Sequence, residues 1–352
     1  LILRMFSIIS MKTLFGPVWY ENYEQPAYVW QSSSATDDFE PKLSLTPLIF
    51  GTLKGTLYAM IFAAPLALLG AIYTSQFMRP RLKNYVKPAI EIMAAVPSVV
   101  IGFLAGLWLA PLVDKAIVPF FVAVAVIPLV VAMAVFLWQK IGSTPFFKRM
   151  AKGYEFLLLI PALLLGVYVS HALGAMLESV LFAGDFKLWL FDALGTRFDQ
   201  RNSIIIAFAL GLAVIPLIFT MAEDALSNVP KNLSAASLAI GASRWQTAWR
   251  VVLPSALPGI FSAVMIGFGR AIGETMIVLM ATGNTPIMDW SIFNGFRTLS
   301  ANIAVEIPEA PLFGTLYRVL FLSAVLLFIF TFIINTVAEV LRQKFRKKYG
   351  RF

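Results

Sequence analysis

Long apolar stretches constrain this chain more than any other feature of its sequence. A run of about 20 mostly apolar residues is long enough to cross a bilayer as a helix. We expect seven such spans, at residues 48–76, 89–112, 117–139, 155–176, 203–222, 258–282 and 315–340. With 59% hydrophobic and 13% charged residues, the chain has more apolar surface than a water-soluble core of this size hides. The sequence therefore predicts an all-α, polytopic transmembrane helical bundle.

The basic residues are distributed unevenly between the two sides of the predicted bundle. The loops after the first, third, fifth and seventh spans carry 17 Lys and Arg residues, against eight on the opposite side. Since basic residues concentrate in cytoplasmic loops, we expect a cytoplasmic C-terminus and an N-terminus outside, and the net charge of +9 reflects membrane topology instead of nucleic-acid binding. An outside start without a signal peptide requires an upstream membrane segment. With Leu1 in place of an initiator Met, this predicts that the chain is a fragment.

Several kinds of chemistry are missing from the sequence. There is no cysteine, so disulfides and thiolate metal sites are excluded. The single histidine, His171, has no accompanying cluster of ligand residues, so no metal site is expected. No Gly-x-x-x-x-Gly-Lys-Ser/Thr phosphate loop is present, so we expect a chain that is not an enzyme and binds no ATP.

Two charged residues, Arg270 and Glu274, lie inside the sixth predicted span. A charge at mid-membrane costs between ~2.5 and ~17 kcal/mol, so such residues usually face a bundle interior or a water-filled path. On a helix the two residues are one turn apart and can pair. A guanidinium left partly free is a bidentate partner for a phosphate oxyanion. The alternative is a structural ion pair that holds two subunits together.

The same helix is predicted to be two-sided. Gly267 falls on the face of Arg270 and Glu274, which suits close helix packing, while Ile260 and Ile272 fall on the opposite face, which we expect to contact lipid. Near the ends of the first and last spans, Lys54 and Arg318 are expected either to snorkel or to form a cationic mouth for an anion.

A polar segment between the fifth and sixth spans, residues 223–257, is predicted to form two short amphipathic helices. Asn232 is placed to cap the first helix, which Gly241 ends in a left-handed turn. Ser243 is placed to cap the second, which Pro254 stops. By itself this pattern is equally typical of an interfacial helix that lies on lipid headgroups.

The segment resembles the cytoplasmic loop of ABC importer permeases. In that family Glu-Ala-Ala, three residues, Gly, nine residues and Ile-x-Leu-Pro dock into a cleft on the ATPase subunit. Here Ala235, Ala236 and Ser237 precede Gly241, and Leu253 and Pro254 follow at the family spacing. Ala235 stands where the family usually has Glu.

A narrower resemblance is to the permeases of phosphate-specific ABC importers. It is carried by the run from Gly269 to Thr275, Gly-Arg-Ala-Ile-Gly-Glu-Thr, and by Glu91 with 96–100, by Glu223 and by 297–303. It covers about 48–112 and 201–345. Residues 113–200, with two extra spans, resemble an insertion in larger versions of one phosphate permease subunit.

The resemblance implies a MetI-like permease with five regions. These are an extracytoplasmic, periplasmic segment (1–47), core helices (48–112), an inserted helix pair with a periplasmic loop (113–200), a second core part with the ATPase-docking loop 223–257 (201–345), and a basic cytoplasmic tail (346–352). It places Gly269, Arg270, Gly273, Glu274 and Thr275 along the translocation path.

The same resemblance implies partners and a location. It predicts a second permease subunit, an ATPase dimer that binds ATP and Mg²⁺, and a periplasmic phosphate-binding protein, all around a multi-pass protein of the bacterial inner membrane. Two alternatives stay open. One is an ABC permease for another oxyanion or small solute, and the other is an ion-coupled secondary transporter.

Overall fold

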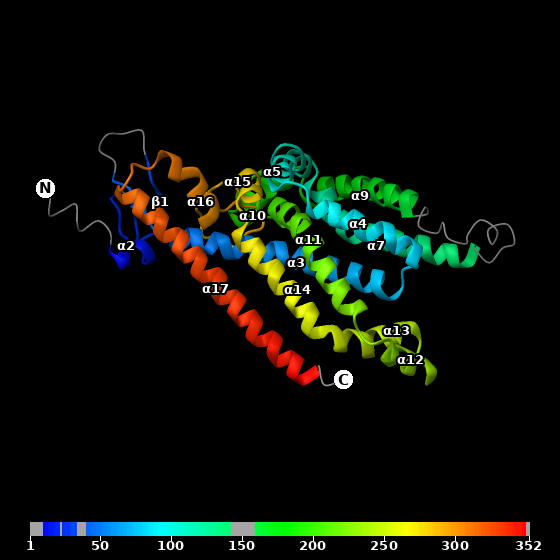
Figure 1. Cartoon of the computed structure of the whole chain (residues 1–352). Helices are drawn as coiled ribbons and strands as arrows, with labels where there is room; N and C mark the ends of the chain where they lie inside the picture. The colour runs from blue at the N-terminus through cyan, green and yellow to red at the C-terminus, as the bar shows by residue number, and fades with distance from the viewer. Residues whose placement is uncertain (1–9, 22, 34–39, 142–158, 350–352) are drawn as a thin grey trace. The chain divides into compact units, whose positions relative to one another are not determined.

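The computed structural model is almost entirely helical (Figure 1). It describes residues 10–21, 23–33, 40–141 and 159–349. The basic residues Lys148, Arg149 and Lys152, and the start of the predicted span 155–176, therefore lie outside the described residues. Seven described helices are long and apolar enough to cross a membrane, which confirms the predicted number of spans. The chain divides into two compact units, Leu1–Leu107 with Arg201–Phe352, and Trp108–Gln200.

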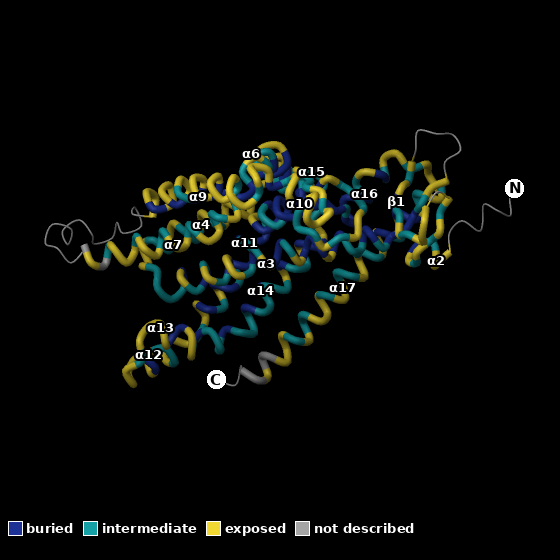
Figure 2. The backbone as a smooth tube through the Cα atoms, turned by 180° about the vertical axis from the view of Figure 1, so that it is seen from behind, coloured by how far each residue is buried: buried dark blue, intermediate teal, exposed yellow. Residues whose placement is uncertain are grey.

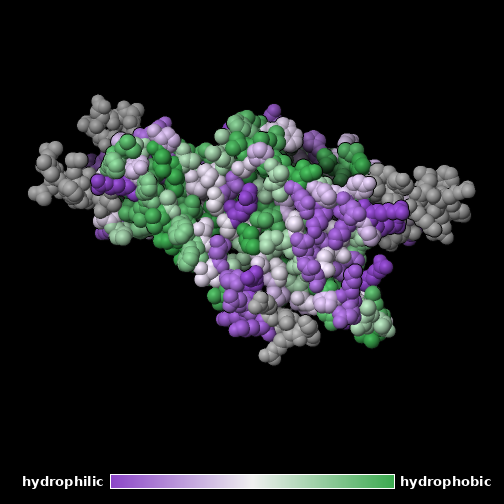
Figure 3. Space-filling model, in the orientation of Figure 1, coloured by the Kyte–Doolittle hydropathy of each residue, from purple (hydrophilic) through white to green (hydrophobic). Residues whose placement is uncertain are grey.

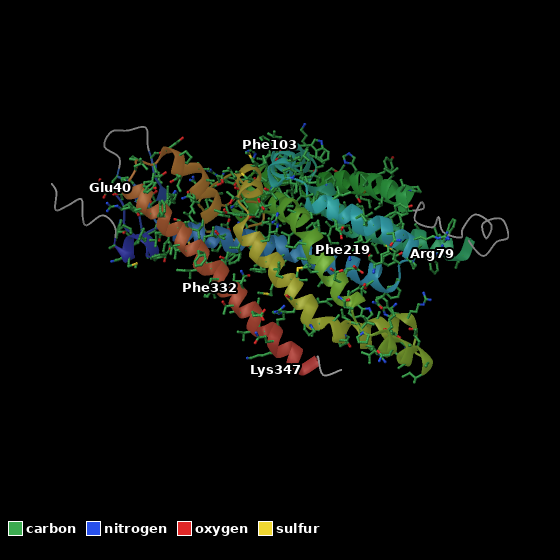
Figure 4. All side chains as sticks on the ribbon, in the orientation of Figure 1. Glu40, Arg79, Phe103, Phe219, Phe332 and Lys347 are labelled. Carbon is green, nitrogen blue, oxygen red and sulfur yellow. The ribbon has the colours of Figure 1, made fainter. Side chains whose placement is uncertain are left out.

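The centre of the first unit is the pair of helices α3 (Thr46–Gln76) and α11 (Ser203–Ser227). Buried alanines recur every four residues along α3, at Ala59, Ala63, Ala67 and Ala71. Because small residues let helix backbones approach closely, this stripe brings α11 against α3. The helix α14 (Leu253–Gly273) packs on α11, and α17 (Thr315–Tyr349) packs on α14. Figure 4 labels Phe219 on α11 and Phe332 on α17, on either side of the α14 ribbon.

An extended segment between Thr282 and Thr298 crosses α3 at two glycines. A Cβ atom on Gly51 would lie 2.1 Å from the carbonyl oxygen of Arg297, and one on Gly55 would lie 2.5 Å from the ring of Phe296. Both distances are shorter than contacts that real Cβ atoms make. The segment therefore contacts α3 where only glycine leaves room.

Replacing Gly51 with alanine is expected to destabilise the protein by at least the ~1–3 kcal/mol typical of overpacking, because the obstacle is backbone and cannot rotate away. Gly70→Ala on the same helix is the matched control, since its Cβ would meet only the Phe219 ring at 3.4 Å. The measurement is the melting temperature of the purified permease in detergent. Equal melting temperatures for the two variants would contradict this crossing.

The second predicted span, 89–112, differs from the structure. Helix α4 (Pro80–Ala94) ends before Pro97, and a separate helix begins at Ser98. Proline disfavours helical backbone at the residue before it, which explains the break at Val96. The spanning helix is Ser98–Lys115, made of α5 (Ser98–Phe103), a π-helical turn (Leu104–Leu109) and α6 (Ala110–Lys115). Glu91 consequently lies on α4, where it is exposed.

The sixth predicted span, 258–282, is also placed differently. Its helix begins at Arg244 and runs through α13 (Arg244–Thr247), a π-helical turn (Ala248–Val252) and α14 (Leu253–Gly273). The prediction that Pro254 stops the second loop helix is therefore wrong. The wide turn before Pro254 supplies the altered hydrogen-bond register that a residue without an N–H requires. A short helix, α15 (Met276–Ala281), follows after a break.

The residues before the first span pack onto the end of the bundle formed by α16 (Leu299–Glu306) and α17. They form a short helix, α2 (Met11–Phe15), and a two-stranded antiparallel sheet, β1 (Trp30–Gln31) with β2 (Lys42–Leu43). One apolar cluster joins this segment to the bundle: Leu14, Trp30, Leu43, Leu45, Leu48, Leu299, Val319 and Leu320. A 3₁₀ turn, η4 (Ile307–Glu309), follows α16.

The second unit contains the packed helices α7 (Ile117–Ile141) and α9 (Leu159–Leu181) and the shorter α10 (Phe186–Leu194). Gly174 brings α9 against Pro119, where a Cβ would lie 2.4 Å from the proline Cα. Figure 2 shows exposed and half-buried residues along most of α7 and α9, in contrast to the buried stretches of α3 and α11. These apolar exposed faces are typical of helices that contact lipid.

Candidate functional site

The helix that carries Arg270 ends at Gly273. Glu274 has extended backbone (φ −67°, ψ 125°), and its carbonyl accepts a hydrogen bond from the Ser300 hydroxyl at 3.0 Å. The predicted helical pairing of Arg270 with Glu274 is therefore wrong, and no ion pair joins them in the described part of the chain. Glu274 therefore lies outside the helix that carries Arg270.

Arg270 lies at a groove between α14 and α17, with a volume of about 530 Å³. Ser262, Gly269 and Arg270 line it from α14, and Asn335, Glu339 and Arg342 line it from α17. Gly269 is necessary for the close approach, because a Cβ there would lie 3.0 Å from Asn335 Oδ1. Arg270 is exposed, and among described residues its guanidinium makes no hydrogen bond or ion pair. Its five donors are thus available to a ligand.

The opposite side of α14 is not the lipid face that the sequence predicted. Ile260 and Ile272 are buried, and Gly267 packs against Ile218 of α11. The helix packs on α11, α17 and α3, so these residues contact protein, while Ile266 and Arg270 at the groove are exposed. Gly273 has open space around it, and the Thr275 hydroxyl donates to the Gly273 carbonyl at 3.3 Å.

The polar loop between α11 and α14 begins with α12 (Lys231–Ala239), which ends in a Schellman motif. Gly241 has φ +90°, its N–H donates to the Leu238 carbonyl, and the Ala242 N–H donates to the Ser237 carbonyl. This confirms the predicted left-handed glycine. The start of the first helix differs, because Pro230 occupies the cap position that was assigned to Asn232.

The second loop helix begins at Ser243, as predicted. Its hydroxyl accepts from the Gln246 N–H at 3.2 Å, and the Gln246 side chain accepts from the Ser243 N–H at 2.8 Å, which forms a capping box. The hydroxyls of Ser237 and Thr247, both buried, share a hydrogen bond of 3.0 Å. This bond ties α12 to the long helix that leads to Arg270.

The outer surface of this loop carries large apolar side chains. Ile240 is 86% exposed and Trp245 is 58% exposed, and Ala235 and Ala236 are exposed as well. Leu253 and Pro254 lie half-buried in the first turn of α14. Figure 3 shows hydrophilic side chains around this loop and toward the C-terminal end of α17. An apolar tip within a polar rim is typical of a protein-docking surface.

At the base of the loop, a cluster of opposite charges joins α4 to α11. The buried carboxylate of Glu223 accepts from Lys83 at 2.5 Å and from Lys87 at 3.1 Å, and Lys87 also contacts Asp224 at 2.7 Å. The hydrogen bond to Asp224, followed by those to Glu223, raises the pKa of Lys87 against the lowering effect of burial. Glu223 was singled out from the sequence without its partners, because Lys83 and Lys87 lie about 140 residues upstream, in a stretch that was expected to be a loop and is part of α4.

Three further charged side chains lie at the other end of the first unit, and of these Lys54 and Glu306 are buried and Arg297 is half-buried. Lys54 is fully buried, with its ammonium 6.0 Å from the Tyr58 ring centre and 5.7 Å from that of Phe296, so the prediction that it snorkels is wrong. Arg297 pairs with Glu306 at 2.9 Å, and Trp30 Nε1 donates to the same carboxylate oxygen at 2.9 Å. Burial lowers the pKa of Arg297, and Glu306 opposes that change.

Seven helices long and apolar enough to cross a membrane, a capped polar loop and an arginine in a groove are together typical of a membrane transport subunit. The sequence pattern of one family matches residues 63–350, and the chain belongs to that family, the binding-protein-dependent transport system inner membrane components. It is a multi-pass inner-membrane protein and the permease of an ABC importer.

Curated relatives have related descriptions. The chain is 27% identical over 307 residues to the phosphate transport system permease protein PstC of Xylella fastidiosa. The aligned residues are 87% of this chain and 76% of that PstC protein. PstC of Pasteurella multocida is 27% identical over 86% of this chain and 76% of its own length. The probable ABC transporter permease protein YqgH of Bacillus subtilis is 26% identical over 76% of this chain, which spans only 62% of that protein.

Proposed function

We propose that this chain is the permease subunit of an importer for inorganic phosphate. The observation that carries the proposal is Arg270, an unpaired guanidinium among the described residues, placed at an open groove between two membrane-spanning helices. A planar guanidinium offers a bidentate fork for phosphate oxygens. The PstC relatives support the same substrate, since their descriptions name phosphate.

The chain supplies a path and a docking loop in this proposal, and its partners supply the rest. A second permease of similar fold completes the path. An ATPase dimer binds ATP and Mg²⁺ and contacts the loop at 223–257 on the cytoplasmic side of the membrane. A periplasmic phosphate-binding protein delivers the substrate on the opposite side of the membrane. Closure of the ATPases moves the loop, and the bundle alternates between outward and inward access. Arg270 contacts phosphate transiently, with Gly269, Gly273, Glu274 and Thr275 around it.

Another oxyanion is the second candidate, because a guanidinium accepts any tetrahedral oxyanion of similar size. The two candidates separate in an uptake assay. The permease, its partner permease, the ATPase and the binding protein are reconstituted in vesicles, and ATP-driven uptake of phosphate, sulfate and molybdate is measured. We expect uptake of phosphate alone. Uptake of sulfate or molybdate in preference to phosphate would contradict the proposal, and uptake driven by an ion gradient without ATP would place the chain with secondary transporters.

The docking role of the loop gives a prediction at Gly241. Gly241→Val should cost more than the ~1 kcal/mol of left-handed strain, misplace the helix that begins at Ser243, and reduce uptake while the permease still inserts. Gly195→Val is the matched control, because Gly195 also has positive φ (+63°) with open space around it but lies outside the loop. Both uptake and membrane abundance are measured. Wild-type uptake by Gly241→Val would refute the docking assignment.

A further inference from the structure

The groove at Arg270 continues along α17 toward its C-terminal end. A second cavity, of about 370 Å³, shares Ser262, Glu339 and Arg342 with the first and extends to Gln343. A third, of about 410 Å³, shares Asn335 and Glu339. The three hollows are therefore neighbouring open grooves along α17, with Arg270 at one position and Arg342 at another.

The spacing of the α17 residues explains why they share this face. Asn335, Glu339 and Arg342 follow one another by four and three residues, so they lie on one stripe of the helix. Asn335 lies opposite Gly269, beside Arg270. Seven residues separate Asn335 from Arg342, which corresponds to about 10 Å along the helix axis. From the sequence, Arg342 counted only among the basic residues that follow the seventh span.

Arg342 is held by a weak and displaceable partner. Its Nη2 contacts Glu339 Oε2 at 2.8 Å and Oε1 at 2.9 Å, and both side chains are 46% exposed. An exposed ion pair of this kind contributes little free energy, so an incoming dianion replaces the carboxylate at low cost. The charged residues that line the groove, two arginines and one glutamate, leave it net positive, which attracts anions.

We propose that Arg342 forms a second contact for the phosphate oxyanion in transit, about 10 Å along the groove from Asn335. Glu339 holds the guanidinium between passages and competes with phosphate for it, which promotes release. This inference rests on the proposed function, since it concerns the same groove and substrate. The same oxyanion chemistry is present in an anionic lipid headgroup, and the experiment separates the two sources.

The test uses the complete importer in two sets of vesicles, one of zwitterionic lipid alone and one with added anionic lipid. Uptake at saturating phosphate is measured for Arg342→Gln, Arg342→Lys and Lys344→Gln. We expect Arg342→Gln to lower the maximal rate about tenfold in both vesicle types, through loss of a charge-assisted contact. Arg342→Lys should lose less. Lys344→Gln is the matched control, because its position is about 200° further around the helix, and its rate should stay unchanged.

Other results would overturn the proposal. If Arg342→Gln loses activity only with anionic lipid, and the wild type is equally slow without it, the ligand of Arg342 is a headgroup. If Arg342→Gln matches Lys344→Gln in both vesicle types, Arg342 has no part in transport. ATP hydrolysis stimulated by the loaded binding protein is measured in parallel, and its loss would show a folding or assembly defect and assign Arg342 a structural role. A wild-type importer that takes up a different oxyanion contradicts the proposed function instead, and the variants are then compared with that oxyanion.

Discussion

Arg270→Gln is expected to reduce phosphate uptake by about a hundredfold, because a bidentate, charge-assisted contact to the substrate is lost. The structure shows no pairing of Arg270 with Glu274, so Glu274→Gln alone should have a smaller effect. The double variant should transport as poorly as Arg270→Gln, since removing both charges does not restore a cationic fork. Uptake and membrane abundance are measured for all three variants.

A scaffold pair behaves in the opposite way. If Arg270 and Glu274 stabilised each other, each single variant would leave a buried charge unpaired, and the double variant would recover much of the loss. Recovered uptake in the double variant would therefore contradict the prediction that Arg270 contacts the substrate. Gly269→Ala provides a further comparison, because its new Cβ displaces Asn335 in the same groove without changing any charge.

Glu306→Gln is expected to destabilise the permease by roughly 3–5 kcal/mol, because it leaves Arg297, whose side chain is only 15% exposed, without its charged partner. Trp30→Phe removes one hydrogen bond to the carboxylate, worth about 1.5–3 kcal/mol, together with part of a buried ring. The measurement is thermal unfolding of the purified protein in detergent. The double variant Arg297→Met with Glu306→Leu should recover stability, since apolar residues replace the whole pair. A double variant that is less stable than Glu306→Gln would contradict this account.

The prolines show how far the sequence could predict the fold. Apolar run length predicted the number of spans because it depends only on local composition. Pro97 breaks its helix and Pro254 does not, although both follow apolar residues. The difference lies in a π-helical turn before Pro254, which tertiary packing selects and which no local pattern marks.

The candidate site, too, could be predicted from the sequence only in part. Gly241 and Ser243 were predictable, because caps and left-handed turns depend on residues close in sequence. The partnership of Arg297, Glu306 and Trp30 joins positions up to 276 residues apart, so only the fold reveals it. Arg342 was missed for a different reason. Its stripe lies at the end of a long apolar run, where a basic residue is typical of a topology anchor.

The helix α14, from Leu253 to Gly273, has a mechanical consequence for the proposed mechanism. Twenty-one residues at 1.5 Å each make a helix of about 31 Å, with the docking loop at one end and Arg270 near the other. A helix of this length that tilts by about 10° around its midpoint moves both ends by roughly 3 Å, in opposite directions. That displacement is about the length of a hydrogen bond. In the proposed importer, a push on the loop would thus give or withdraw the guanidinium from a bound anion without any helix unfolding.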